Sequence, residues 1–522
     1  MEQPIPRWQV YSPATGELIG EIEPTLIHQT PAIYARARQA FPAWSGLPIE
    51  QRLAHFRQLR LLMVEQMESI TAVIAASAGK TKVEAITADI MPTLDAIAHM
   101  EKYAARDLGQ QKRSTPMMLV GRRSYVQYIP RGVVLVISPW NYPLQLAMIP
   151  MLSALAAGNT VILKPSEVTP MVGRLIEDLF DQAGFPPGVV QVAHGGKELG
   201  AALTAGKPDY IFFTGSVRTG KMIAAQAAKD LIPTTLELGG KDPMIVFQDA
   251  NLERAVQGAM WGAFTNSGQV CMSVERLYVE RPLYERFVAR LVEEVKELRQ
   301  GVDLDDDIGS MTFPGQLDVI KEHLDDALAR GARLLTGVKP SDWDHSKGLF
   351  VPPMVLVDVK QEMKVVQEES FGPFLPIIPF DSEDEAIRLA NDSRFGLNAS
   401  VWSADLAKAQ RVAAKIVAGA VVINDVIVTT ANHHLPFGGV KESGWGRYHG
   451  EIGLRSFCHE KSVMVSRGSQ ATELQWYPYR GKYALLYTLF RSYYGARRDL
   501  PGFLVSFLKL MRLPRGQRRQ DK

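Results

Sequence analysis

Residues 133–164 read VVLVISPWNYPLQLAMIPMLSALAAGNTVILK. Two short apolar runs, 133–138 and 160–164, flank a longer run over 144–157. Short apolar runs bounded by Gly, Pro and Asn are typical of buried strands, whereas the longer run has the length of a helix. The stretch therefore predicts a strand, a helix and a second strand, the unit from which parallel sheets are built.

The same alternation continues along the chain. It predicts further helices over 172–183 and 199–205, and further strands over 189–192 and 210–214. Two later apolar runs, 244–247 and 276–279, each precede a helical pattern and indicate a second α/β unit. Because strands separated by helices favour a parallel sheet covered on both faces, we predict an α/β fold.

The length and composition exclude several classes of protein. The chain has 522 residues, 46% of them hydrophobic, which predicts about three domains of roughly 150 residues each. With only Cys271 and Cys458, a disulfide scaffold and a metal site of clustered cysteines are excluded. No apolar run follows Arg7, and prolines interrupt the most apolar stretch, 132–163. We therefore expect a cytoplasmic protein without a secretory signal or a membrane span.

Cys271 is a candidate nucleophile in the segment NSGQVCM, residues 266–272. A lone cysteine is usually core filler. This one follows a Gly in a polar loop, where a packing role is less common. A thiolate attacks carbonyl carbons well, so the residue type fits covalent catalysis.

Glu237 is a candidate general base in LELGGK, residues 236–241. The alternative is a carboxylate exposed on an edge strand. Between leucines, a partly desolvated carboxylate has a raised pKa, which favours removal of a proton from water. The two glycines that follow would let the backbone approach a ligand closely.

Asn141 lies in SPWNYP, residues 138–143, where a predicted strand ends. Ligands bind at the carboxyl ends of parallel strands. The Asn141 amide could donate a hydrogen bond to an oxyanion. The alternative is a turn-forming Asn between two prolines.

Three further segments could hold a nucleotide. FTGSVRTG, residues 213–220, follows a strand and opens a helix, whose amide groups can bind phosphate. KPSE, residues 164–167, ends a strand with a cation and an acceptor that could hold ribose hydroxyls. ESFGP, residues 369–373, again places a carboxylate beside a tight turn.

Taken in order, these segments resemble the aldehyde dehydrogenase superfamily. The motifs that carry the resemblance span most of the chain up to about residue 465, and they are SPWNYP, ILKPSE, FTGS, LELGGK, NSGQVC, EESFGP and LPFGGVKESGWGR. Because several motifs occur in the family's order, chance similarity is very improbable.

The resemblance implies a role for each matching residue. Cys271 would be the nucleophile, Asn141 and the Cys271 backbone N–H the oxyanion donors, and Glu237 the general base. Phe437 would lie in the substrate pocket, and no metal is implied. The residues implied for binding NAD, with NADP as the alternative, are Trp140, Lys164, Glu167, Gly215, Ser216, Gly220, Glu369 and Phe371.

The resemblance also implies an aldehyde dehydrogenase-like fold with a Rossmann-type cofactor domain, a second α/β catalytic domain and a small β element for oligomerisation. The expected boundaries are 1–108 with 131–237 for the cofactor domain, 238–435 for the catalytic domain, 109–130 with 436–465 for the β element, and 466–522 for a tail. We expect a homo-oligomer, specifically a homodimer, with a small-molecule aldehyde as substrate and no nucleic-acid partner.

The implied reaction is NAD(P)-dependent oxidation of an aldehyde to the carboxylic acid through a thiohemiacetal and a thioester on Cys271. We expect a long-chain, aromatic or isoprenoid aldehyde. Tyr448 stands where many tetrameric members have Glu, and the pattern Tyr-His-Gly at 448–450 is more similar to the class 3 side, with bacterial carotenoid-aldehyde enzymes among its neighbours. A reactive thiolate also implies a Cys271 pKa below the free value of about 8.5, and Glu167 should disfavour NADP by repelling its phosphate.

Two alternatives remain at this point. The enzyme could transfer the thioester to coenzyme A, although the resemblance suggests that acylating members often lack the base that Glu237 supplies. The chain could also be a non-catalytic binding protein on the same scaffold, which the joint presence of Cys271, Asn141 and Glu237 disfavours.

The tail differs in charge from the rest of the chain. From residue 481 onward ten Lys and Arg residues face two Asp residues, a net +8, so the remainder of the +2 chain carries −6. Apolar residues recur there at helical spacing on both sides of Pro501, namely Leu486, Leu489, Phe490, Tyr493, Phe503, Phe507 and Leu510. The pattern predicts either two helices packed on the enzyme or a peripheral contact with an anionic membrane.

Overall fold

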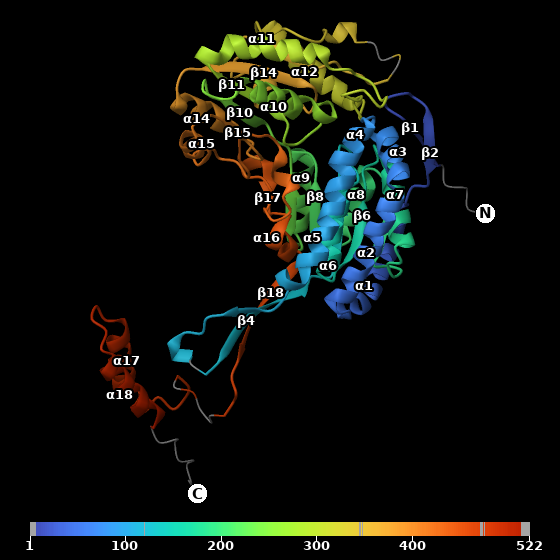
Figure 1. Ribbon diagram of the computed structural model, residues 1–522. Coiled ribbons are helices and arrows are strands. Elements are labelled where there is room, and N and C mark those ends of the chain that lie inside the picture. Colours follow the sequence, from blue (N-terminus) through green and yellow to red (C-terminus); the bar gives the residue numbers. More distant parts are fainter. Residues whose placement is uncertain are drawn as a thin grey trace, which may run out of the picture. The chain divides into compact units, whose positions relative to one another are not determined.

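The computed structural model describes residues 7–119, 121–343, 346, 348–469, 473 and 475–512. The chain forms two compact units, each drawn in Figure 1: Met1–Gln110 with Gln127–Lys461, and Gln111–Val126 with Ser462–Lys522. The basic residues of the tail beyond Arg512 lie outside the described residues. The predicted division into cofactor, catalytic and oligomerisation domains stays a prediction.

A six-stranded sheet forms the centre of one part of the larger unit. Its strand order is β17-β9-β8-β5-β6-β7, and all neighbouring pairs described are parallel except β17 with β9. The bounds are β5 Val133–Ile137, β6 Thr160–Lys164, β7 Val190–Val192, β8 Tyr210–Thr214, β9 Thr234–Glu237 and β17 Gly444–Trp445. The predicted strands 133–138, 160–164, 189–192 and 210–214 are therefore confirmed.

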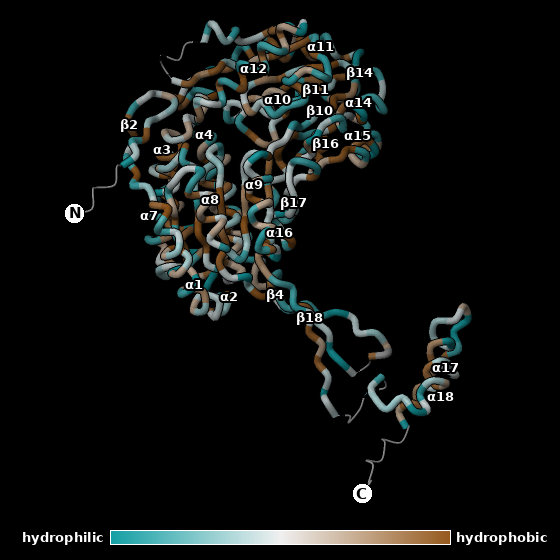
Figure 2. Tube along the Cα trace, turned by 180° about the vertical axis from the view of Figure 1, so that it is seen from behind, coloured by the Kyte–Doolittle hydropathy of each residue, from teal (hydrophilic) through white to brown (hydrophobic). Residues whose placement is uncertain are grey.

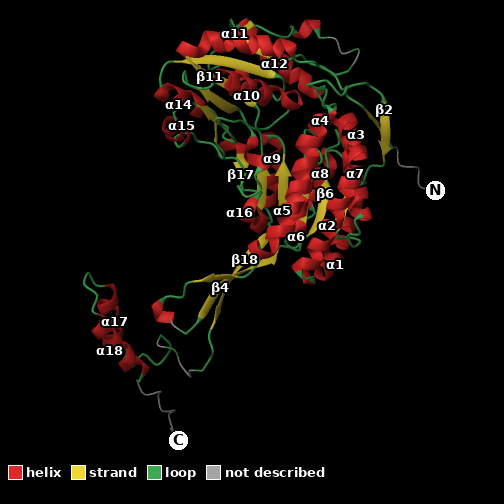
Figure 3. Ribbon diagram, viewed as in Figure 1, coloured by secondary structure: helices red, strands yellow, loops and turns green. Residues whose placement is uncertain are grey.

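Helices cover this sheet on both faces, as Figure 3 shows. Both faces need a cover because the strands are apolar on both sides, and in β5 all five residues are buried. Val134 and Val136 enter one apolar cluster, and Val133, Leu135 and Ile137 enter another. The helices of this part are α1 Thr30–Gly46, α2 Ile49–Glu65, α3 Met67–Ala78, α4 Lys82–Glu84, α5 Met91–Asp107, α6 Gln145–Ala156, α7 Pro170–Gln182, α8 Lys197–Ala205, α9 Val217–Ala228 and α16 Gly450–Ser456.

A seven-stranded sheet forms the second α/β part of the larger unit. Its order is β12-β13-β14-β11-β10-β15-β16, and β12 is the antiparallel edge. Its strands are β10 Asp242–Val246, β11 Val274–Glu280, β12 Arg333–Leu334, β13 Met354–Val357, β14 Phe374–Phe380, β15 Ser400–Trp402 and β16 Val422–Ile423. Its helices are α10 Leu252–Phe264, α11 Arg281–Glu297, α12 Gly315–Ala329, α13 Lys364–Gln367, α14 Glu383–Asn391 and α15 Leu406–Ala413. The expectation of a second α/β unit around β10 and β11 is confirmed.

Smaller elements complete the chain. β1 Trp8–Tyr11 and β2 Leu18–Ile22 form an antiparallel pair, and β3 Gln111–Arg113, β4 Arg123–Pro130 and β18 Cys458–Val465 form a three-stranded sheet. The second unit also holds α17 Tyr483–Tyr494 and α18 Leu500–Met511. Pro501 lies in the first turn of α18, where a missing N–H costs no helical hydrogen bond.

Among the described helices, none is by itself long and apolar enough to cross a membrane. Helices α2 and α3 together have the length and the apolar composition of a membrane span, but the pair is bent by 76°.

Candidate active site

Four of the sequence motifs meet at one edge of the six-stranded sheet. Because β5, β6, β8 and β9 are parallel, their carboxyl ends lie along the same edge. Residues 138–143 follow β5, residues 165–167 follow β6, and residues 215–216 follow β8. Glu237 is the last residue of β9. The strand order thus brings together side chains that are up to about a hundred positions apart in sequence.

Cys271 follows a turn of unusual backbone conformation. Asn266, Ser267 and Gly268 have φ values of 51°, 56° and 71°, all in the left-handed region. A side chain at Gly268 would place its Cβ 2.1 Å from the Gly372 carbonyl oxygen, so only glycine fits there. The turn delivers the half-buried Cys271 to the wall of a cavity.

The Asn141 side chain is held against the turn that carries Cys271. Its Nδ2 donates to the Gln269 carbonyl oxygen at 2.9 Å. The backbone carbonyl oxygen of Asn141 accepts from Lys80 Nζ at 2.8 Å and from Asn266 Nδ2 at 3.0 Å. The Asn141 side chain thus bonds to the backbone of the Cys271 turn, and the Asn266 side chain of that turn bonds to the Asn141 backbone.

A buried network of charged side chains supports this arrangement, and no motif in the sequence predicts it. Lys80 Nζ pairs with Asp89 Oδ2 at 2.8 Å, and both side chains are almost fully buried. Asp89 Oδ1 accepts from the Leu144 backbone N–H at 3.1 Å, just before α6. Glu84 Oε1 accepts from the Asn266 N–H at 2.5 Å. Lys80, Glu84 and Asp89 all lie within eleven residues after the apolar helix α3, but no spacing rule connects them to residue 266.

Glu237 is buried, and neither of its carboxylate oxygens has a hydrogen-bond partner among the described residues. A Cβ at Gly438 would lie 2.7 Å from Glu237 Oε1, so the carboxylate packs against bare backbone. Burial raises the pKa of Glu237 well above its usual value, and the positive charge of Arg447 opposes this shift only in part. An unpartnered, desolvated carboxylate of this kind is a strong proton acceptor.

The two glycines after Glu237 let the backbone approach Glu369 and Cys271 closely. A Cβ at Gly239 would lie 2.1 Å from Glu369 Oε2, and one at Gly240 would lie 2.2 Å from the Cys271 carbonyl oxygen. These glycines therefore let the segment after β9 pack directly on Glu369 and on the backbone of Cys271.

The expected low pKa of Cys271 is not what the structure shows. Burial raises the pKa of the Cys271 thiol, and the carboxylates of Glu369, Asp242 and Glu237 raise it further. The hydrogen bond from its own backbone N–H opposes the shift only weakly. The physical reason is that the thiol faces carboxylates, whereas a lowered pKa needs nearby positive charge.

The residues predicted to hold the adenine half of a nucleotide lie at the same sheet edge. Lys164 Nζ pairs with Glu167 Oε2 at 2.6 Å; Lys164 is buried, whereas Glu167 is partly exposed. Ser216 caps the amino terminus of α9 by accepting from the Thr219 N–H at 3.3 Å. A Cβ at Gly220 would lie 2.6 Å from Leu238 Cδ2, so glycine lets α9 pack closely on the segment after β9.

Glu369 and Phe371 come from the turn before β14. Glu369 Oε1 accepts from the Gly240 N–H at 3.1 Å, and burial raises the Glu369 pKa to about 8. Phe371 has a φ of 50°, and its ring meets the Trp140 ring edge to face at a centroid distance of 5.4 Å. Glu275 holds this turn by accepting from the N–H groups of Ser370 and Phe371 at 2.8 and 2.9 Å.

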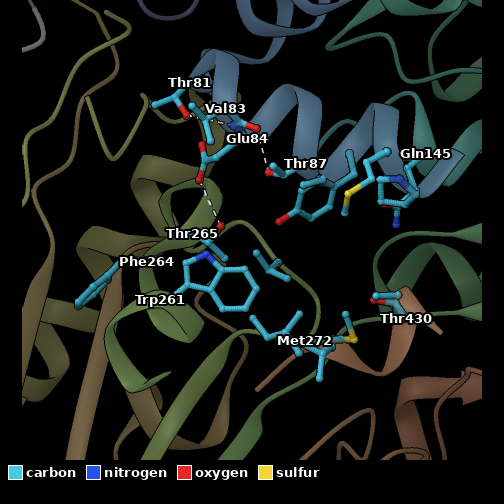
Figure 4. Close-up of a pocket in the computed structure, with 18 of the residues that line it drawn as sticks. Thr81, Val83, Glu84, Thr87, Gln145, Trp261, Phe264, Thr265, Met272 and Thr430 are labelled. Atoms are coloured by element: carbon cyan, nitrogen blue, oxygen red, sulfur yellow. Dashed lines mark hydrogen bonds between the residues drawn. The ribbon is translucent and has the colours of Figure 1, made fainter. Parts of the chain in front are cut away.

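The cavity beside Cys271 has a volume of about 730 Å³. Phe437 and Tyr448 line it and are joined by two backbone hydrogen bonds of 2.8 and 2.9 Å. Figure 4 shows Val83, Glu84, Trp261, Phe264 and Met272 around the opening between the two α/β parts of the larger unit. Most of its apolar lining consists of Val83, Met91, Leu146, Met260, Trp261, Phe264, Val270, Met272, Leu298, Leu304, Ile427, Val428 and Phe437.

Among the described residues, all the charged side chains that line the cavity are acidic. Glu84, Asp305, Asp306 and Asp307 line it, and no Lys, Arg or His does so among the described residues. Among the residues that the structure describes, no group of three or more His, Cys, Asp or Glu side chains could hold a metal ion.

Comparison with known proteins agrees with this geometry. The model of the aldehyde dehydrogenase family matches residues 2–463. A 4,4'-diapolycopene aldehyde oxidase from Methylomonas sp is 44% identical over 472 residues, which cover 90% of this chain and 87% of that protein. A putative succinate-semialdehyde dehydrogenase [NADP(+)] from Mycobacterium bovis is 36% identical and covers 87% of each chain. The structure of betaine aldehyde dehydrogenase from Staphylococcus aureus with NAD+ has a TM-score of 0.84 and 33% identity, covering 90% of this chain and 93% of that one.

Proposed function

Because this chain belongs to the aldehyde dehydrogenase family, we propose that it oxidises a long, apolar aldehyde to the carboxylic acid with NAD(P), through a thioester on Cys271. The observation that carries the proposal is the position of Cys271 in the wall of a large, mainly apolar cavity, beside Asn141 and Glu237. The homodimeric state and the cytoplasmic location also belong to this proposal.

In the first half of the reaction, one of the carboxylates beside Cys271 takes the thiol proton and passes it to solvent, and Sγ attacks the aldehyde carbon. A carboxamide has two N–H donors. One N–H of Asn141 binds the Gln269 carbonyl oxygen and fixes the orientation of the group. The second N–H can therefore donate to the developing alkoxide without reorganisation, together with the backbone N–H of Cys271.

The residues present fit a dinucleotide. The capped amino terminus of α9 offers N–H groups for phosphates, and the exposed carboxylate of Glu167, held by Lys164, can accept from ribose hydroxyls. Glu369 would bind the second ribose, and Trp140 and Phe371 would flank the nicotinamide half. When bound, NAD(P) accepts the hydride that the aldehyde carbon loses.

In the second half, water attacks the thioester carbon, and Glu237 takes a proton from that water. The burial that raises the pKa of Glu237 makes it a better proton acceptor than an exposed carboxylate. The Cys271–carbonyl bond breaks, the leaving sulfur takes the proton from Glu237 and becomes a thiol again, and the acid leaves. This use of Glu237 favours release of a free acid over transfer to coenzyme A.

The lining of the cavity supports an uncharged, apolar substrate. Four carboxylates and no basic side chain line it among the described residues, so an aldehyde that carries its own carboxylate would be repelled. The relative from Methylomonas sp is named for a carotenoid aldehyde, which has the expected length and apolarity.

A panel of aldehydes assayed with NAD and with NADP tests the proposal. We expect long aliphatic, aromatic and isoprenoid aldehydes to give a higher kcat/KM than succinate semialdehyde, because the cavity offers no cation for a carboxylate. Equal or better use of succinate semialdehyde would overturn the substrate assignment. NADH formation that requires coenzyme A would overturn the hydrolytic mechanism.

A further inference from the structure

Helices α17 and α18 form a hairpin with its own small apolar seam. Leu489, Phe503 and Leu510 are buried in that seam, and the rings of Tyr493 and Phe503 are in contact with centroids 5.3 Å apart. The helices are joined by residues 495–499, where Asp499 caps the amino terminus of α18. The seam uses only one side of each helix.

A second apolar stripe lies outside the seam on each helix. On α17 the stripe has the spacing four, three, four, and on α18 it has the spacing four, four, three, so each is a single helical face. Their side chains are exposed, from 43% for Phe490 to 80% for Tyr483. The members of the two stripes are Tyr483, Tyr487, Phe490 and Tyr494 on α17, and Leu500, Leu504, Leu508 and Met511 on α18.

The two stripes form one face of the hairpin. In an antiparallel pair with the seam between the helices, the helical periodicity turns both stripes to the same side. Thr488 of α17 and Lys509 of α18 fall on the opposite side, whereas Arg491, four positions after Tyr487, borders the α17 stripe. The hairpin is therefore apolar on one broad face and polar on the other, and Figure 2 shows brown segments along both helices.

The charge and the aromatic residues around this face indicate what it binds. Between 475 and 512 there are seven basic residues and one acidic residue, Asp499. Just before α17, Trp476, Tyr477 and Tyr479 are exposed by 55%, 75% and 60%. Tyr and Trp are enriched where lipid meets water, and Lys and Arg are attracted to anionic headgroups.

We propose that the α17–α18 hairpin binds the surface of a bilayer that contains anionic lipids. The apolar face enters the boundary between headgroups and acyl chains, and basic side chains that border this face, such as Arg491, reach the phosphates. The apolar stripes need a nonaqueous partner, and the net positive charge selects a negative one. This inference is independent of the proposed function, because vesicle binding is expected whichever aldehyde the enzyme oxidises.

Flotation of the full chain with vesicles tests the proposal. We expect binding to vesicles of phosphatidylcholine with phosphatidylglycerol, weaker binding at high salt, and little binding to phosphatidylcholine alone. Leu504→Asp and Tyr487→Asp each put a charge on the apolar face, and each should lower the partition coefficient by at least about tenfold. Thr488→Asp is the matched control, because it adds the same charge to α17 on the polar side, and it should retain most of the binding.

The remaining outcomes decide against the proposal. If the intact chain ignores anionic vesicles at low salt, the hairpin does not bind lipid. If Leu504→Asp binds vesicles like the parent but changes the oligomeric mass in solution, the face instead contacts a second copy. If it binds like the parent and lowers the melting temperature, the face packs on the enzyme itself. Unchanged circular dichroism and unchanged turnover of a short soluble aldehyde confirm that each variant is folded.

Discussion

At the scale of single residues, Cys271 lies in acidic surroundings. Glu237, Glu369 and Asp242 all raise the pKa of its thiol, in addition to burial. A thiol of this kind stays protonated near neutral pH until a base removes its proton. The neighbouring carboxylates therefore suppress the thiolate in the resting enzyme and also supply the bases that could take up its proton.

Replacement of the nucleophile should separate chemistry from cofactor binding. In Cys271→Ala we expect no dehydrogenase turnover, because no thioester can form, and nearly unchanged NAD affinity by titration calorimetry, because the thiol faces the aldehyde cavity. Substantial NADH formation by this variant would show that Cys271 is not the nucleophile.

Glu237→Gln should separate the two half-reactions. We expect one rapid burst of NADH per site followed by steady turnover that is lower by about 10²–10⁴-fold, as for loss of a general base. Stopped-flow absorbance gives both quantities. If the burst itself disappears, Glu237 also takes the proton from Cys271. If steady turnover is unchanged, Glu237 is structural and Glu369 becomes the better candidate.

The pH dependence should follow the raised pKa values. Glu237, Glu369 and Cys271 all have a raised pKa, with Glu369 at about 8. The thiol is a nucleophile and the carboxyl groups are bases only when they are deprotonated, and the deprotonated fraction increases with pH. We therefore expect kcat/KM, and the rate of Cys271 alkylation by iodoacetamide, to rise from about pH 6 to about pH 9. A flat profile over that interval would contradict the pKa directions.

At the scale of elements, the segment around α4 lines the cavity and also supports the turn that carries Cys271. Lys80 connects Asp89, which caps the segment before α6, to the backbone of Asn141. Glu84 holds the left-handed turn that precedes Cys271. Three elements that are distant in sequence thus share one buried polar network, and its failure should affect both stability and catalysis.

Lys80→Met tests this network. The substitution leaves Asp89 buried without its cation, which typically costs about 3–5 kcal/mol of unfolding free energy. We expect a lower denaturation midpoint and, at temperatures where the variant is folded, a lower kcat, because Asn141 loses a contact that orients it. Lys82→Met is the control, since Lys82 is exposed on α4 and should change neither quantity. Unchanged kcat in Lys80→Met would limit the network to a structural role.

At the scale of the whole molecule, the candidate catalytic residues and the tail belong to different units. Every residue assigned to chemistry or to the cofactor lies in the unit of Met1–Gln110 with Gln127–Lys461, and α17 and α18 lie in the other. The larger unit holds both α/β sheets and their cores. Catalysis on a soluble substrate should therefore not require the hairpin.

A chain that ends at Gly468 tests this independence. We expect it to retain the parent's kcat on a short soluble aldehyde, because the cavity and its lining are intact. We expect it to lose efficiency on a long-chain aldehyde presented in anionic vesicles. Aggregation of the shortened chain, or dissociation into inactive protomers by light scattering, would show that the tail packs within the enzyme or its oligomer.

The sequence by itself determined the α/β class, the position of most central strands and the identity of the candidate nucleophile, base and oxyanion donor. Strands such as β5 and β6 are buried on both faces, so their apolar runs are visible without any partner. Motifs such as SPWNYP and LELGGK could be placed because a parallel sheet gathers the carboxyl ends of its strands at one edge.

Only the tertiary structure decided the surroundings of those residues. The contact of Lys80 with Asn141 and that of Glu84 with Asn266 join residues 61 and 182 positions apart. The raised pKa of Cys271 depends on carboxylates from three different elements, and the lining of the cavity comes from segments between Thr81 and Tyr448. Local periodicity in the sequence indicates which face of a helix or strand is buried. The charge and the contacts around one side chain depend on which other elements pack against it.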